Sequence, residues 1–156
     1  MRSDCEFIRV SGVVKTGKHS EKWIAWIIAA LDEHVDEETK AKILEQCGRQ
    51  CQSESFVRKA RKIYEKSENV EEFLNRFGQV YENLHREGDE VYIIHPKCYC
   101  PNVNKIPPGK LSATYCNCSR GWAKELLKGA LGSPVEVVME KSIVNGDEQC
   151  KFKIVL

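Results

Sequence analysis

Apolar residues recur at spacings of three and four through the first half of the chain, as on one face of an α-helix. Ser20 is a typical N-cap residue, and the run over 23–31 that follows it is apolar nearly all round. We therefore expect this first helix to lie deep in the core. Asp36 can cap a second helix over 37–51, and the same periodicity predicts a third helix over 56–64.

A fourth helix has the clearest pattern. Asn69 stands at the N-cap position and Glu72 follows three residues later, which is the arrangement of a capping box. Apolar positions then continue at helical spacing as far as Leu84. The sequence predicts a helix over 70–84, and the linkers between the four helices are short enough for a compact helical layer.

The pattern changes at Gly88. Residues 91–94 are β-branched or aromatic and are soon followed by Pro96, which indicates a strand. A loop rich in Pro, Asn, Lys and Gly occupies 101–110. We predict a further short strand within 111–118.

The last part of the chain combines one helix with two strands. The helix is predicted to start at Ser119 and to end at Gly132, in the manner of a C′ glycine. Alternating runs over 135–143 and 150–155 flank a turn at 145–147, and the Asn-Gly pair in that turn is typical of a β-hairpin.

These elements predict the fold class. A helical half over about 18–86 followed by a sheet-rich half over about 88–156 indicates an α+β fold. We expect an N-terminal helical layer packed on a C-terminal antiparallel sheet with one further helix. At 156 residues the chain is predicted to be a single domain, 1–156. Residues 1–15 are β-rich and predict one or two short strands.

Charge and hydropathy exclude two classes of partner. Twenty-four Lys and Arg against twenty-three Asp and Glu leave a net charge of +1, so we expect no nucleic-acid partner. The densest basic stretch, 58–62, is interpreted as a solvated helix face. The longest apolar run, 23–31, is far short of the ~20 residues of a membrane span. The N-terminus lacks the apolar segment of a secretory signal, so we expect a cytoplasmic protein with no membrane partner.

The chain contains eight cysteines, and the expected location decides how they are interpreted. The cytosol keeps thiols reduced, so closely spaced cysteines are expected to be metal ligands, redox thiols or nucleophiles rather than disulfides. Cys98 with Cys100, and Cys116 with Cys118, are spaced so that both side chains of each pair point the same way in an extended segment. Two such forks, face to face, are what a tetrahedral zinc–thiolate site or an iron–sulfur cluster requires.

Cys47 and Cys51 are four residues apart and therefore share one face of the predicted second helix. Core packing and function are both open for this pair. Cys5 is interpreted as an incidental small hydrophobe, while Cys150 lies near the end of the chain. The predicted metal ligands are Cys98, Cys100, Cys116, Cys118, Cys47, Cys51 and Cys150.

An enzyme with thiol chemistry is the alternative that remains open. Cys47 or Cys51 would then be the nucleophile and His95 the base of a small hydrolase or reductase. The sequence shows no Gly-rich phosphate loop, no nucleophile elbow and no complete catalytic constellation, so the catalytic residues are unknown.

The segment 135–152, with Gly146-Asp147 followed by Cys150, resembles the end of 4-vinyl reductase domains and of L-2-amino-thiazoline-4-carboxylic acid hydrolase-like proteins. The two Cys-x-Cys pairs ahead of a Gly-Trp helix look like an uncharacterised bacterial and archaeal branch of that group. The resemblance covers about the last seventy residues, and the helical half only in general layout. It implies a Bet3-like fold that binds a small molecule.

In sensory members of that group, cysteines bind a structural zinc beside a hydrophobic ligand cavity. The resemblance places Cys150 at the terminal cysteine, but Ser142 and Met139 stand where those zinc sites use a cysteine and a carboxylate. Either the metal has moved to the Cys-x-Cys pairs, or the cysteines serve another purpose.

The expected function is a small-molecule-binding domain with a thiolate metal site, with zinc as the expected metal and an iron–sulfur cluster as the alternative. Trp23, Trp26 and Trp122 are candidate walls of the ligand pocket. The sequence leaves the oligomeric state open, a homodimer included.

Overall fold

The computed structural model describes residues 19–101, 103–107 and 109–156, so the strands predicted within 1–15 lie outside the described residues. The helices are α1 (His19–His34), α2 (Glu37–Cys51), α3 (Glu54–Tyr64), α4 (Val70–Gly78) and α5 (Asn117–Leu131). The strands are β1 (Leu84–Glu87), β2 (Glu90–His95), β3 (Glu136–Lys141) and β4 (Cys150–Val155), and two short 3₁₀ helices are η1 (Ala113–Cys116) and η2 (Ile143–Asn145).

The four strands form one antiparallel sheet in the order β1-β2-β4-β3. In the centre, β2 and β4 pair with Ile93 opposite Phe152, and both side chains are fully buried. The predicted α+β class is confirmed. Among the described helices, none combines the length and apolar character needed to cross a bilayer.

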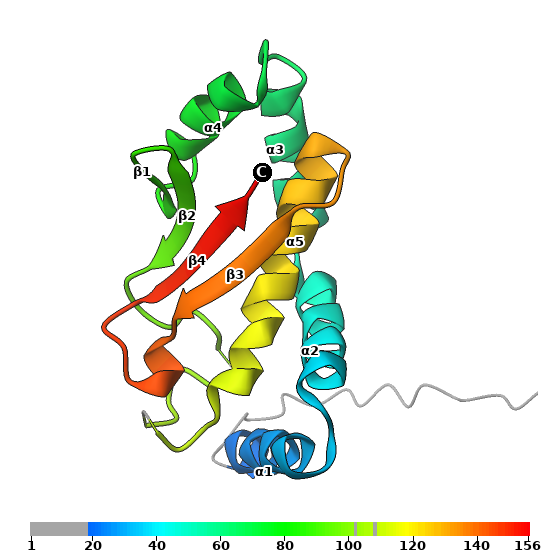
Figure 1. Cartoon of the computed structure of the whole chain (residues 1–156), viewed down its shortest axis with the longest axis vertical. Coiled ribbons are helices and arrows are strands. Elements are labelled where there is room, and N and C mark those ends of the chain that lie inside the picture. Colours follow the sequence, from blue (N-terminus) through cyan, green and yellow to red (C-terminus); the bar gives the residue numbers. More distant parts are fainter. Residues whose placement is uncertain (1–18, 102, 108) are drawn as a thin grey trace, which may run out of the picture.

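Helix α5 is the central helix of the fold. It lies between the sheet and α2, and α3 also packs on it (Figure 1). Leu126 and Leu127 on α5 are fully buried in a core shared with Phe73 and Phe77 of α4 and Val137 of β3. The helical layer is therefore built on α5, which itself covers the sheet.

The predicted caps at Asp36 and Asn69 are confirmed, whereas Ser20 lies inside α1 and Ser119 lies inside α5, and the predicted end of the fourth helix is wrong as well. Asn69 accepts the N–H of Glu72, as expected from the capping box. The helix ends at Gly78, and Leu84 begins β1 instead, buried and paired with Ile93. A residue seven positions after Phe77 satisfies helical spacing, but pairing with β2 buries Leu84 equally well. Strand β1 thus lies inside the predicted helical half.

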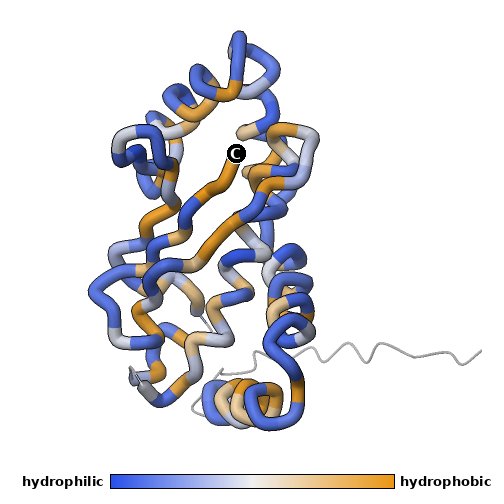
Figure 2. The backbone as a smooth tube through the Cα atoms, in the orientation of Figure 1, coloured by the Kyte–Doolittle hydropathy of each residue, from blue (hydrophilic) through white to orange (hydrophobic). Residues whose placement is uncertain are grey.

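The expectation that the first helix lies deep is wrong. Helix α1 lies at the edge of the fold and carries many hydrophobic positions (Figures 1 and 2). It contacts α2 and η1, and Ile28 is buried, whereas Trp23 and Trp26 are 56% and 61% exposed. Polar contacts hold the helix in place. Asp32 accepts hydrogen bonds from the ammonium group of Lys40 and from the hydroxyl of Thr114.

The strand predicted within 111–118 is also wrong. Ser112 accepts the N–H of Thr114 and starts η1, which leads directly into α5 at Asn117. At the C-terminus, the antiparallel pair β3 and β4 is confirmed. Their connection is longer than a tight hairpin, because η2 precedes the turn glycine Gly146, whose φ is 97°.

Two glycines allow α2 and α5 to touch along their backbones. A Cβ on Gly48 would lie 1.8 Å from the carbonyl oxygen of Cys118, and one on Gly121 would lie 2.0 Å from the carbonyl oxygen of Glu45. Neither contact involves a flexible side chain that could move aside. The spacing of these helices therefore depends on the absence of a side chain at both positions.

We predict that Gly48→Ala destabilises the fold by about 3 kcal/mol, because the helices must separate to admit the methyl group. Gly78→Ala is the matched control, since its Cβ would meet its nearest neighbour at an ordinary 3.7 Å. We expect the control to be neutral or stabilising by at most about 1 kcal/mol. Urea unfolding of the three proteins measures both effects, and equal stabilities would contradict the close packing.

Candidate functional site

Most of the described cysteines meet at one cavity of about 410 Å³. The cavity lies where the end of β2, the loop that follows it, the start of α5 and the start of β4 come together. Cysteines from four separate segments of the chain line it: Cys51, Cys98, Cys100, Cys116, Cys118 and Cys150. No carboxylate is among the described residues that line this cavity.

On the sheet side of the cavity, Cys150 begins β4 opposite the end of β2. Cys116 lies 3.1 Å from the hydroxyl of Ser142, and the N–H of Ile143 points to the sulfur of Cys150 at 3.4 Å. The segment after β3 therefore holds both buried thiols in place. In the sequence, Ser142 stands out only as a position where the resemblance would require a cysteine ligand, and no sequence signal indicates its contact with Cys116.

Burial controls the chemistry of these sheet-side thiols. It raises the pKa of Cys116 to about 12, and the nearby thiols of Cys150, Cys98 and Cys100 act in the same direction. Burial also raises the pKa of Cys150, with a further contribution from Cys98. Both groups are therefore neutral thiols at neutral pH in the absence of a bound cation.

On the helix side, Cys118 in the first turn of α5 lies beside the last turn of α2. The close approach of Gly48 to the Cys118 backbone brings Cys47 and Cys51 to this place. Burial is the main cause that raises the pKa of Cys118 to about 12. The nearby thiols of Cys51, Cys100 and Cys47 act in the same direction. Unlike Cys118, Cys47 and Cys51 are exposed, which excludes core packing as the reason for this pair.

The prediction of two facing forks is wrong for Cys116 and Cys118. These residues lie at the junction of η1 and α5, where the chain turns about 100° per residue, so side chains two positions apart diverge. Cys116 belongs to the sheet side and Cys118 to the helix side. Cys98 and Cys100 lie in the loop after β2, and the Cys100 sulfur is 3.1 Å from the Tyr115 hydroxyl.

The donor set suits a soft metal, but the donors are not assembled around a point. Within the part of the chain that the structure describes, no group of three or more His, Cys, Asp or Glu side chains is arranged to hold a metal ion. Thiols are the preferred donors of zinc and of iron–sulfur clusters. Metal binding would therefore have to draw the thiols together.

Aromatic rings form another part of the wall. Trp122 lines the cavity as expected, with His95 and Tyr99, while the exposed positions of Trp23 and Trp26 show that their assignment to the wall is wrong. His95 is packed among these rings and shares a 3.1 Å hydrogen bond with the Tyr81 hydroxyl. Burial lowers the pKa of His95, so the ring is neutral at neutral pH.

A second cavity of about 430 Å³ adjoins the first. Lys97, Cys98, Val103 and Val144 line both cavities and so separate them. The second cavity carries polar groups of both signs, since Lys97 and Glu148 line it. The thiol cavity therefore has a polar neighbour only one layer of side chains away.

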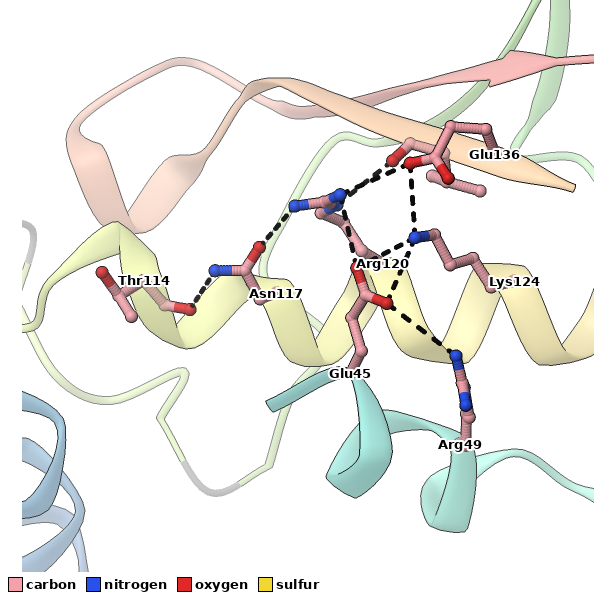
Figure 3. A network of polar contacts seen from close by, with 8 residues as sticks. Glu45, Arg49, Thr114, Asn117, Arg120, Lys124 and Glu136 are labelled. Atoms are coloured by element: carbon pink, nitrogen blue, oxygen red, sulfur yellow. Dashed lines mark hydrogen bonds and ion pairs between the residues drawn. The ribbon is translucent and has the colours of Figure 1, made fainter. Parts of the chain in front are cut away.

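An ion network centred on a buried carboxylate fixes α2 on α5 next to the site (Figure 3). Glu45 on α2 is only 8% exposed. It accepts two hydrogen bonds from the Lys124 ammonium group, at 3.0 and 3.1 Å, and forms an ion pair with Arg120 at 3.3 Å. Glu136 on β3 also contacts both cations, at 3.3 and 3.5 Å. Glu45 thus connects α2 to α5, and Glu136 connects β3 to α5, through the same two cations.

Comparison with known proteins identifies a family. The sequence profile of a family described as "Family of unknown function (DUF6144)" matches residues 7–156. No curated protein matches the chain closely enough to count as a relative. The resemblance to 4-vinyl reductase domains stays a prediction.

We predict that Glu45→Gln lowers the free energy of unfolding by about 3 kcal/mol, because removing one partner leaves buried charge uncompensated. In this variant Glu136 still contacts both cations, so the loss of stability should be at the lower end of the range for breaking a buried ion pair. Glu54→Gln is the control, since its pair with Arg58 is exposed and should contribute less than about 1 kcal/mol. Similar losses in urea unfolding of the two variants would contradict this assignment.

A pH dependence follows from His95. The folded protein holds its imidazole neutral, whereas the unfolded chain takes up a proton below the ordinary value of 6.5. The stability that this group contributes is therefore present above that pH and is lost as the pH falls below it. We expect wild type to lose more stability than His95→Gln between about pH 7.5 and pH 5 in denaturant unfolding. Parallel profiles would show that His95 does not titrate as inferred.

Proposed function

The chain belongs to this family of unknown function, and we propose that it is a small-molecule-binding domain whose cavity carries a thiolate metal site, with zinc as the metal. The observation that supports this most is the convergence of six cysteines from four segments on one cavity. Free cysteine often packs as a small hydrophobe, but the exposed Cys47 and Cys51 gain nothing from packing.

The energetics of the thiols favour a metal over free thiolates. Cys116 and Cys118 have pKa values raised to about 12, so the cavity alone keeps them protonated. A divalent cation reverses this preference, because each thiol that binds releases a proton and its charge is then neutralised by the metal. The N-terminal end of α5, where both residues lie, adds the positive end of a helix dipole.

The cavity also leaves room for a small organic ligand. Its volume of about 410 Å³ is in the range of small-molecule pockets, and Trp122 and Tyr99 give it flat apolar walls. Lys97 is the only charged side chain, with His95 neutral, among the described residues that line it. These properties suit a compact, mainly apolar molecule, as the resemblance to 4-vinyl reductase domains also suggests.

A thiol-dependent enzyme is the second candidate, because the exposed thiol of Cys51 and the His95 ring line the same cavity. A nucleophilic thiol needs a nearby base. The hydrogen-bond partner of His95 is instead the Tyr81 hydroxyl, and burial disfavours the protonated ring. This candidate therefore ranks below the metal site.

The expected cytoplasmic location belongs to the same proposal. A thiolate site with exposed members such as Cys47 and Cys51 persists best where thiols are kept reduced. An oxidising compartment would favour disulfides among thiols gathered this closely.

We predict that freshly purified protein carries at least one equivalent of zinc, together with any bound small molecule, as extra mass in native mass spectrometry. Cys118→Ser should reduce retained metal below about half an equivalent, because it removes a buried thiolate donor. Cys5→Ser is the matched control, because Cys5 has no second cysteine close to it in the sequence. This variant should leave the metal content unchanged.

The contrary result is also defined. A chain without metal even after reduced reconstitution with zinc, in which one thiol alkylates rapidly at neutral pH, would support the thiol enzyme instead. Brown protein that contains iron and inorganic sulfide would replace zinc with a cluster in the same cavity.

A further inference from the structure

Helix α1 exposes an apolar face at the edge of the fold (Figures 1 and 2). Among the exposed large hydrophobic side chains of the described residues, Trp23, Trp26 and Ile27 all lie on this helix, with exposed fractions of 56%, 61% and 39%. Ala29 and Ala30 are exposed as well. Because a tryptophan buries up to about 250 Å² when it is covered, these side chains leave roughly 400 Å² of apolar surface in water. A patch of that size is typical of an interaction site.

The exposed face carries charge and bulk in a definite order. Glu33 follows Lys22 by eleven residues, which is about three turns of an α-helix, so these two exposed residues lie on the same side of α1. Trp26 and Ala29 lie between them at helical spacing on that side. From its N-terminal end to its C-terminal end, the face is therefore cationic, bulky, small and anionic.

This order is self-complementary when two copies of α1 lie antiparallel. A two-fold axis midway between Lys22 and Glu33 would place each lysine against the glutamate of the other copy. The same axis would place each Trp26 ring against Ala29 of the other copy, so that a large side chain meets a small one. Both contacts would occur twice, as symmetry requires of such an interface.

The antiparallel arrangement also suits the charges of the face. Lys22 lies near the positive N-terminal end of its own helix and Glu33 near the negative C-terminal end, so that dipole stabilises neither charge. In an antiparallel pair, each charge lies near the opposite end of the partner helix, whose dipole attracts it. Within its own chain Glu33 contacts His34 at 3.8 Å, and both side chains are largely exposed, so this pair competes little.

We propose that α1 is the dimer interface of this protein, formed by antiparallel contact with α1 of a second copy about a two-fold axis. The inference is independent of the thiol cavity and of the function proposed for it. The contact would bury roughly 800 Å² in total, which is less than the ~1,200 Å² at which specific stable interfaces begin. We therefore expect a reversible dimer with a dissociation constant on the order of micromolar.

A membrane surface fits this face less well than a second copy does. Helices that lie on membranes carry several Lys and Arg residues, which are attracted to anionic lipids. In α1, the carboxylates of Glu21, Asp32 and Glu33 outnumber Lys22, the only Lys or Arg of the helix. An anionic bilayer would therefore repel the helix.

The test is sedimentation velocity of the full-length chain over a range of concentrations, under reducing conditions because Cys47 and Cys51 are exposed. We expect wild type to dimerise as its concentration rises. Trp26→Glu should raise the dissociation constant by at least about tenfold, because it places two like charges at the centre of the contact. Val138→Glu is the matched control, since Val138 is 44% exposed but lies on β3, and it should leave the dissociation constant unchanged.

Charge reversal tests the antiparallel register. Lys22→Glu should raise the dissociation constant by at least about threefold, because two ion pairs become two repulsive contacts. Adding Glu33→Lys to this variant should restore a dissociation constant within about twofold of wild type, because the two ion pairs form again with their signs exchanged.

Several outcomes would overturn the proposal. They are a wild type that stays monomeric at every concentration, a dimer that Trp26→Glu leaves intact, and a double variant that binds no more tightly than Lys22→Glu alone. A monomer that binds vesicles containing phosphatidylglycerol would assign the face to a membrane instead. A monomer that trypsin fails to cut within residues 1–18 would assign the face to the N-terminal segment of the same chain.

Discussion

The backbone contact between α2 and α5 is the constraint on which the rest of this structure depends. Gly48 and Gly121 let the helices approach until a methyl group would collide with a carbonyl oxygen of the partner. At that separation Glu45 loses access to water, and Lys124 and Arg120 must supply the compensating charge. Close packing and buried ion pairing are therefore two consequences of one geometry. The same geometry carries the last turn of α2 to the start of α5, where the thiols gather.

Local interactions made much of the fold predictable from sequence. Asp36 and Asn69 cap their helices through contacts three residues away, so a short window of sequence contains the whole interaction. Leu84 and the tryptophans of α1 were assigned wrongly because their burial is decided by distant partners. A period of three and four shows that a helix has an apolar face, but it does not show whether the protein covers that face.

The sequence could single out candidate residues for the site, but not their arrangement in space. Spacing singled out seven cysteines as candidates, and six of them line one cavity, whereas Cys47 does not. Their grouping depended on Ser112, which starts η1 and so turns Cys116 and Cys118 apart. The role of Gly48 was equally invisible, although a glycine inside a helix, where it is unfavourable, is a sign that a backbone approaches closely.

The contrast in exposure between the two groups of thiols gives them different physical tasks. Cys116 and Cys150 are buried, and as neutral thiols they are compatible with an apolar core even without metal. Cys47 and Cys51 lie on the exposed face of α2, where a thiol adds little to packing and is open to oxidation. A solute reaches an exposed thiol directly from solvent, whereas Cys116 and Cys150 are shielded by the residues around them. Among the thiols that line the cavity, Cys51 is thus the exposed one, and Cys116 and Cys150 are the protected ones.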